Sequence, residues 1–165
     1  MSLKQKKESG FIFIEVVIAT AVIGAAFVIL LAIGAQAINY SHDIKKETEM
    51  DFLIKEEIEA LRSFRDGTDW TTNGLGSAGI ITGNPYYLAL SGGAWSLTPD
   101  VEIIDSLTSR SIIFDKVSRD PTTKDIEATY NEFNDDPDTR KITVNVAWSG
   151  KTYQVVTYLT NWKNE

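Results

Sequence analysis

Residues Phe11 to Ile38 read FIFIEVVIATAVIGAAFVILLAIGAQAI, an apolar run that contains a single charged residue, Glu15. An α-helix rises about 1.5 Å per residue, so this run reaches about 40 Å, more than a hydrocarbon core of about 30 Å requires. The run therefore predicts a membrane-spanning helix. An unpaired carboxylate within a membrane costs roughly 3 kcal/mol, which makes Glu15 a candidate functional residue.

A short lysine-rich leader, Met1 to Gly10, precedes the apolar run. Positive charge beside a membrane helix retains that end in the cytoplasm, so the N-terminus is expected inside the cell and the C-terminal domain outside. An ordinary secretory signal is cleaved after its apolar core, whereas the small residue here, Gly10, comes before it. The charged residues of the leader are Lys4, Lys6, Lys7 and Glu8.

The junction between leader and apolar run, GFIFIE at Gly10 to Glu15, resembles the prepilin cleavage and methylation motif of type IV pilins and type II secretion pseudopilins. In that family a membrane aspartyl peptidase cuts after the glycine, and the same enzyme N-methylates the new first residue. The resemblance implies that Gly10 ends the leader and that Phe11 becomes the methylated N-terminus. It also implies that Glu15 recruits a neighbouring subunit during filament assembly.

The chemistry of the cut end agrees with this resemblance. Cleavage would create an α-amine at Phe11 that is largely protonated at neutral pH, and methylation keeps its charge. This amine and Glu15 are one helical turn apart, so the pair could close within one chain or between two staggered chains. Removing one partner of a buried ion pair costs about 3 to 5 kcal/mol. The alternative is a plain single-pass anchor whose Glu15 side chain snorkels to the membrane interface.

Composition limits what lies outside the membrane to one domain of ordinary size, residues 39–165. The leader contributes a charge of plus 2 and Glu15 minus 1, so of the overall minus 7 this domain carries about minus 8. Nucleic-acid binding is not expected, because phosphate contacts need clustered lysine and arginine. The chain has no cysteine, so its loops must be held by packing or by an ion rather than by the disulfide that many pilins have.

Helix signals continue beyond the membrane run. An apolar stripe at spacings of three and four predicts that the helix extends from Phe11 to Arg65, about 80 Å, and stops at Asp66-Gly67. We expect the stripe to pack on a sheet, which gives an α+β fold; the family resemblance implies a lollipop with a small antiparallel sheet. The stripe comprises Met50, Ile54, Ile58, Leu61 and Phe64, and the charged residues around it are Lys45, Lys46, Glu47, Glu49, Lys55, Glu56, Glu57 and Glu59.

After the predicted helix, segments whose sequence is typical of β-strands alternate with segments typical of loops. Residues 68–83, in which Trp70, Ile80 and Ile81 are isolated apolar points, predict a long surface loop. The clearest β-signal is a terminal hairpin that turns at Ser149-Gly150-Lys151 and resembles the terminal hairpin of minor pilins. The predicted strands are 86–90, 95–104 with an edge or break at Pro99, 111–117, 142–148 and 153–159.

An acidic segment, Arg119 to Thr139, separates two of these strands. Its oxygen-rich part could supply ligands to Ca²⁺, as a similar loop does in some pseudopilins, but it lacks the spacing of an EF-hand. We therefore favour a solvated acidic turn and assign no metal site; Tyr130 and Phe133 could pin this turn to the core. The residues concerned are Asn134, Asp135, Asp136 and Asp138.

No constellation for nucleophilic, metal or nucleotide chemistry is present in the sequence, and no cofactor is expected. The single histidine, His42, lies beside Asp43 just beyond the apolar run and is expected to be a solvated juxtamembrane residue rather than a catalytic base. The chain is predicted to be a substrate of an enzyme and not an enzyme itself.

The resemblance implies a structural subunit, most like a minor pilin, of a type IV pilus or related filament. Its expected partners are inner-membrane lipid before assembly, other pilin subunits, and the prepilin peptidase and methyltransferase. Its expected final location is the pilus at the cell surface or a periplasmic pseudopilus. Two alternatives stay open: a pseudopilin of a type II secretion or competence system, and an uncleaved membrane-tethered binding module.

Overall fold

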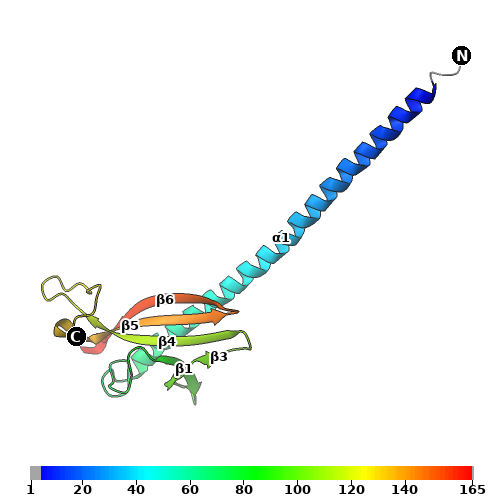
Figure 1. Ribbon diagram of the computed structural model, residues 1–165. Helices are drawn as coiled ribbons and strands as arrows, with labels where there is room; N and C mark the ends of the chain where they lie inside the picture. Colours follow the sequence, from blue (N-terminus) through cyan, green and yellow to red (C-terminus); the bar gives the residue numbers. More distant parts are fainter. Residues whose placement is uncertain (1–4, 165) are drawn as a thin grey trace. The chain divides into compact units, whose positions relative to one another are not determined.

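The structure, a computed structural model, describes the backbone of residues 5–164 and the side chains of residues 11–163. Helix α1 runs from Gln5 to Gly67 and is followed by strands and two short 3-10 helices, η1 and η2 (Figure 1). The chain divides into two compact units, one up to Glu47 and one from Thr48 onward. The later elements are β1 (Pro85–Ser91), β2 (Ala94–Pro99), β3 (Glu102–Ile103), β4 (Thr108–Ser118), η1 (Glu132–Asn134), β5 (Asp135–Trp148), β6 (Lys151–Thr160) and η2 (Trp162–Asn164).

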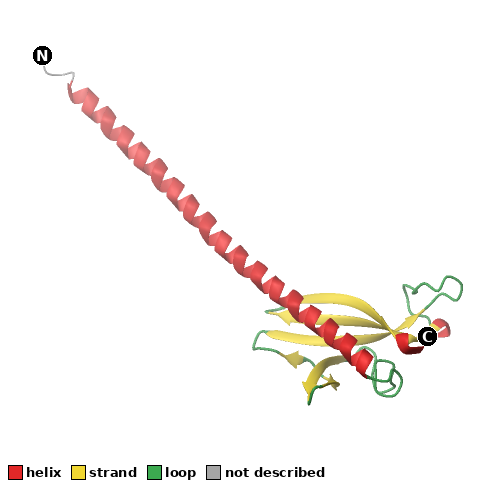
Figure 2. Ribbon diagram, turned by 180° about the vertical axis from the view of Figure 1, so that it is seen from behind, coloured by secondary structure: helices red, strands yellow, loops and turns green. Residues whose placement is uncertain are grey.

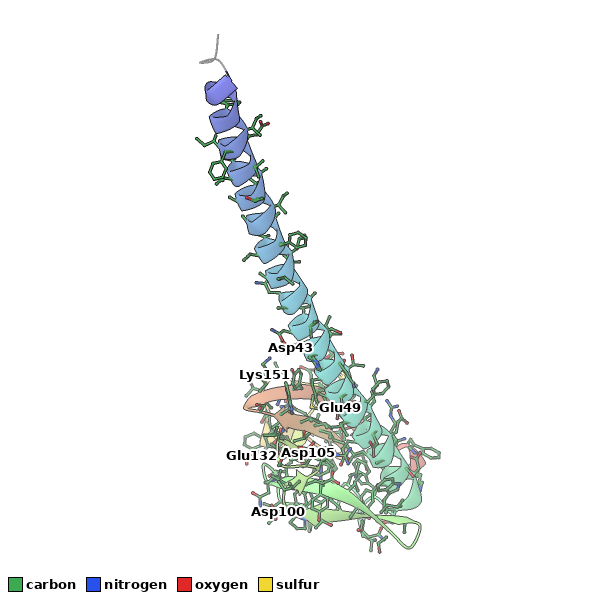
Figure 3. The ribbon with its side chains drawn as sticks, turned by 90° about the vertical axis from the view of Figure 1, so that its right-hand side faces the viewer. Asp43, Glu49, Asp100, Asp105, Glu132 and Lys151 are labelled. Atoms are coloured by element: carbon green, nitrogen blue, oxygen red, sulfur yellow. The ribbon has the colours of Figure 1, made fainter. Side chains whose placement is uncertain are left out.

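The predicted long helix is confirmed, and it begins earlier than expected, inside the leader. In the first unit its apolar side chains are exposed all around the helix (Figure 3). The one hydroxyl in the middle of this run, that of Thr20, donates to the carbonyl oxygens of Val16 and Val17, both at 3.0 Å. A helix that satisfies its own polar groups suits a lipid environment. The apolar part of α1 is long and apolar enough to cross a membrane.

The second unit contains a six-stranded antiparallel sheet in the order β2-β1-β4-β5-β6, with β3 paired to β4. Its centre is the long pairing of β4 with β5, in which Ile112 lies opposite Val144 and Phe114 lies opposite Ile142. All four of these side chains are fully buried. The predicted combination of a helix and an antiparallel sheet is therefore confirmed.

The end of α1 crosses one face of this sheet (Figure 2). Four residues of the predicted stripe, Met50, Ile54, Leu61 and Phe64, are buried in the core, and Ile58 packs against it. Apolar side chains that recur every three or four residues form one continuous face of a helix, and burial of that face stabilises the contact. The expectation that the stripe packs on a sheet is confirmed.

The predicted terminal hairpin is also confirmed, with β5 and β6 in register from Thr139 opposite Thr160 to Trp148 opposite Lys151. Ser149 and Gly150 form its turn with φ values of 47° and 82°. Positive φ at both turn residues matches the twist of the two strands, which explains a glycine in the second position. β5 begins at Asp135, inside the segment expected to be a loop, because Asp135 and Asp136 pair with Ser118 and Val117 of β4.

The prediction of a surface loop at residues 68–83 is partly wrong. The segment is irregular, but Trp70 and Leu75 are buried in the core. The indole nitrogen of Trp70 donates to the carbonyl oxygen of Pro137 at 2.9 Å, which ties this loop to the start of β5. Isolated apolar residues in a loop carry no periodic signal, so their burial depends on distant contacts that a local pattern does not reveal.

Gly76 contacts the Trp70 ring so closely that a side chain there has no room. A Cβ atom at Gly76 would lie 2.2 Å from the indole nitrogen, whereas one at Gly79 would meet nothing within 4 Å. We predict that Gly76→Ala lowers the free energy of unfolding by about 1 to 3 kcal/mol, the usual effect of overpacking, and that Gly79→Ala does not. Urea unfolding followed by tryptophan fluorescence checks this. Equal stability of the two variants would contradict the close contact.

Candidate functional site

The motif residues lie at the start of α1. The backbone of Gly10 is helical, Phe11 is 71% exposed, and Glu15 is exposed one turn further along. The beginning of the predicted leader, Met1 to Lys4, lies outside the described residues. The peptide bond that the predicted cleavage would break is therefore placed at the boundary between the leader and the exposed apolar surface of α1.

Glu15 lies among exposed apolar side chains, including Ile12, Ile14 and Val16. Among residues 11–163, whose side chains the structure describes, none forms an ion pair or hydrogen bond with its carboxylate. In the uncleaved chain the nitrogen of Phe11 is an uncharged amide, so it offers no counter-ion either. Within a membrane this carboxylate needs a cation from outside its own helix or from a newly cut N-terminus.

No family model, curated protein or solved structure matches the chain. The resemblance to prepilins therefore rests on the residues around Gly10, Phe11 and Glu15.

A second charged cluster, which the sequence did not predict, lies between α1 and the sheet. Glu57, one of the charged residues around the apolar stripe, is only 1% exposed. Its Oε2 lies 3.0 Å from Nε of Arg110 on β4, and its Oε1 accepts from the backbone nitrogen of Leu88 at 3.2 Å. Glu57 follows Ile54 by three residues and precedes Leu61 by four, so it lies on the same helix face as the apolar stripe. This spacing was a signal from which its burial could have been predicted.

Arg110 connects this cluster to two further elements. Its Nη2 lies 2.7 Å from Oε2 of Glu102 on β3, and its Nη1 donates to the carbonyl oxygen of Leu53 at 3.2 Å. Oε2 of the more exposed Glu56 lies 3.8 Å from Nη1 of Arg110. Because one guanidinium joins α1, β3 and β4, we expect this network to hold the helix at one position on the sheet.

Burial raises the pKa of Glu57 to about 7, although the Arg110 guanidinium and the Leu88 amide act in the opposite direction. Other carboxyl groups of the second unit, among them Asp69 and Asp120, have a lowered pKa. The backbone amide of Thr72 donates to Asp69 and that of Thr123 donates to Asp120, which stabilises both carboxylates. The titration of Glu57 is therefore separated in pH from that of these surface acids.

The raised pKa predicts that the second unit becomes less stable as the pH rises from about 4.5 to about 7. In this interval the folded state holds a proton on Glu57 that the unfolded state has lost, so its contribution is complete below pH 4.5 and disappears above 7. A difference in the pKa of Glu57 between about 4.5 in the unfolded state and about 7 in the folded state corresponds to about 3 kcal/mol in the free energy of unfolding. Urea unfolding at pH 4.5, 6 and 8 measures it, and Glu57→Gln should flatten the slope. An unchanged slope in that variant would contradict the assignment.

The acidic segment is tied down by hydrogen bonds and ion pairs. Arg119 contacts Oδ2 of Asp136 at 2.5 Å and Oγ1 of Thr139 at 3.2 Å, and Asn161 donates to Asp138 at 2.9 Å. Among the described residues no group of three acids or histidines could hold a metal ion. Solvation alone does not describe this segment, because its last residues begin strand β5: Asp135 and Asp136 pair with β4, and Thr139 pairs with β6.

The suggested anchoring of this segment by two aromatic side chains is wrong. Phe133 is 89% exposed, and Tyr130 is also exposed, with its hydroxyl donating to Asp135 at 3.0 Å. Arg119 has the anchoring role instead, because its guanidinium also donates to the carbonyl oxygen of Lys124 at 3.0 Å. His42, the one histidine, is exposed on α1.

Proposed function

We propose that this chain is a structural subunit, most like a minor pilin, of a type IV pilus or related filament. The observation that carries the proposal is the spacing of Gly10, Phe11 and Glu15 at the start of a membrane-length helix whose apolar side chains are exposed. In this proposal a prepilin peptidase removes the leader after Gly10 and methylates Phe11. The long helix and the sheet then form a pilin-like subunit.

The charges at the N-terminus supply a physical route to assembly. Before cleavage the lysines of the leader keep the N-terminus on the cytoplasmic side of the membrane. After cleavage the Phe11 amine is a cation at the end of an apolar helix, and Glu15 of a neighbouring subunit is an anion at nearly the same depth. When the amine and the carboxylate pair, each charge compensates the other in the apolar environment. The pair therefore sets the stagger between adjacent helices.

A pseudopilin of a type II secretion or competence system would use the same processing and the same pairing, so this alternative belongs to the same proposal. An uncleaved membrane-tethered binding module would need neither the leader cleavage nor the pairing of Glu15 with a Phe11 amine. It would account for the exposed apolar helix but would leave the Gly10, Phe11 and Glu15 spacing without a function.

Replacing Gly10 by leucine is expected to block maturation. A protease must approach the backbone closely at the bond it cuts, and glycine alone lacks a Cβ atom that obstructs this approach. In cells that make a prepilin peptidase, Gly10→Leu should accumulate in membranes at the full precursor mass. Gly34→Leu is a matched control, because a side chain there meets nothing within 4 Å. Normal maturation of Gly10→Leu would argue against the cleavage site.

A further inference from the structure

The sheet of the second unit ends in two open edges. Its strand order, β2-β1-β4-β5-β6, leaves β6 at one edge and β2 at the other. Among the described residues, no backbone hydrogen bond joins either strand to any element except its one neighbour in the sheet. The outward N–H and C=O groups of both strands are therefore available to a further strand.

Both edges lack the features that normally prevent strand addition. Proteins protect an edge strand with charged residues, a proline, a bulge or very short length. β6 is 10 residues long, pairs with β5 without a register shift, and has its one charge, Lys151, at its first position. β2 has no charged residue, and its proline, Pro99, is its last residue.

Apolar surface along β6 is exposed on both faces of the sheet. Val155, on the same face as the buried Leu159, is 38% exposed, and Val156 and Tyr158 on the other face are 46% and 43% exposed. A strand beside β6 would cover side chains on both faces. The domain is acidic overall, but neither edge strand contains an acid, so a second copy meets the least repulsion there.

The directions of the two edges select the partner. Each of the four pairings from β2 through β1, β4 and β5 to β6 is antiparallel, so β2 and β6 run in the same direction. The β6 edge of one copy therefore fits the β2 edge of a second copy in the same orientation. Antiparallel pairing of two β6 strands would instead point the two chains in opposite directions. Chains inserted into one membrane share one orientation, which favours β6 with β2.

We propose that β6 of one copy of this chain pairs with β2 of a second copy as parallel strands, so that the sheet continues from chain to chain. Such a contact uses a different surface on each partner and can repeat along an assembly. The 6 residues of β2 rise about 3.3 Å each, so the pairing can extend over about 20 Å. The inference rests on the proposed filament function for the shared orientation of the chains, and it names a contact between their second units.

The chain has no cysteine, so introduced cysteines permit a direct cross-linking test. Two differently tagged full-length copies are made in the same cells, which lack a prepilin peptidase. One copy carries Ser96→Cys on β2, and the other carries Gln154→Cys, Val156→Cys or Tyr158→Cys on β6. These side chains point to the same face of the sheet, because they alternate with neighbours that pack on the core.

A short bifunctional maleimide is then added to the membranes. We expect a cross-linked dimer that carries both tags for at least one of the three β6 positions, and that position defines the register. When Thr123→Cys, in the exposed acidic segment, replaces the β6 cysteine, this product should be at least tenfold less abundant. Labelling with a monofunctional maleimide checks that every cysteine is reactive.

A lysine on the edge supplies a second test. Thr98→Lys, added to the copy with the β2 cysteine, should lower the yield of the dimer at least tenfold, because charge on an edge strand opposes strand addition. Thr123→Lys, which places the same charge outside the sheet, should leave the yield unchanged. Urea unfolding shows whether each variant is folded.

Two results would overturn the proposal: reactive cysteines on folded chains give no dimer between β2 and β6, or Val156→Cys in both copies gives more dimer than any β2 and β6 combination. The test uses uncleaved chains, so it is separate from the test of processing. A methylated Phe11 without the dimer would count against the strand contact alone. The dimer together with an N-terminus that stays intact beside a prepilin peptidase would count against the filament function alone.

Discussion

The Glu15→Val variant is expected to be cleaved and inserted normally and to be absent from filaments. Removing the acid makes the apolar run more hydrophobic, so insertion should not suffer. The bond after Gly10 is a full helical turn away from the substituted side chain. What the variant loses is the counter-ion for the protonated Phe11 amine of an incoming subunit. That cation would enter an apolar bundle unpaired, at a cost of several kcal/mol.

Two fractions of the same cells measure this effect: mature protein in membranes, and protein in sheared filaments when the other subunits are present. Glu15→Asp keeps the charge and should retain part of the assembly, so it separates loss of the charge from a general defect of the helix. If Glu15→Val reaches wild-type abundance in filaments, Glu15 is not the assembly residue.

The second large effect is expected at Arg110, whose guanidinium joins Glu57, Glu102 and the carbonyl oxygen of Leu53. Arg110→Met leaves Glu57 buried without a counter-ion, and breaking a buried pair in this way costs about 3 to 5 kcal/mol. The cost should be largest near pH 8 and smaller near pH 5, because Glu57 holds a proton below its raised pKa of about 7. A buried neutral acid no longer needs the arginine as a counter-ion.

Tryptophan fluorescence during urea unfolding measures this cost, since all four tryptophans lie beyond residue 69, in the second unit. Arg62→Met is a matched control, because Arg62 forms an exposed pair with Glu59 at 2.5 Å. Exposed pairs contribute about 0 to 1 kcal/mol. In the Glu57→Gln background the effect of Arg110→Met should shrink. If Arg110→Met costs no more than Arg62→Met at pH 8, the network does not hold α1 on the sheet.

Elements with a strong local period were predictable from sequence. The stripe from Met50 to Phe64 repeats every three or four residues, so both the helix and its buried face followed from spacing alone. The terminal hairpin followed from alternating residues around Ser149-Gly150. The acidic beginning of β5 was missed, because Asp135 and Asp136 have low strand propensity and pair with β4 only in the tertiary structure.

Sites that depend on distant partners were not predictable in the same way. Glu57 stands on the apolar stripe, but only the fold brings Arg110 and the Leu88 amide to it. In contrast, Gly10, Phe11 and Glu15 were found from sequence because their spacing is local and does not require a fold to be recognised.

The central claim, that the leader is removed and the chain becomes a pilin-like subunit, is tested most directly by the mass of the N-terminus. Protein extracted from membranes of cells that make a prepilin peptidase is digested, and its N-terminal peptide is analysed by mass spectrometry. The proposal predicts a peptide that begins at Phe11 and carries one additional methyl group. An intact chain beginning at Met1, with no methyl group on Phe11, would contradict it.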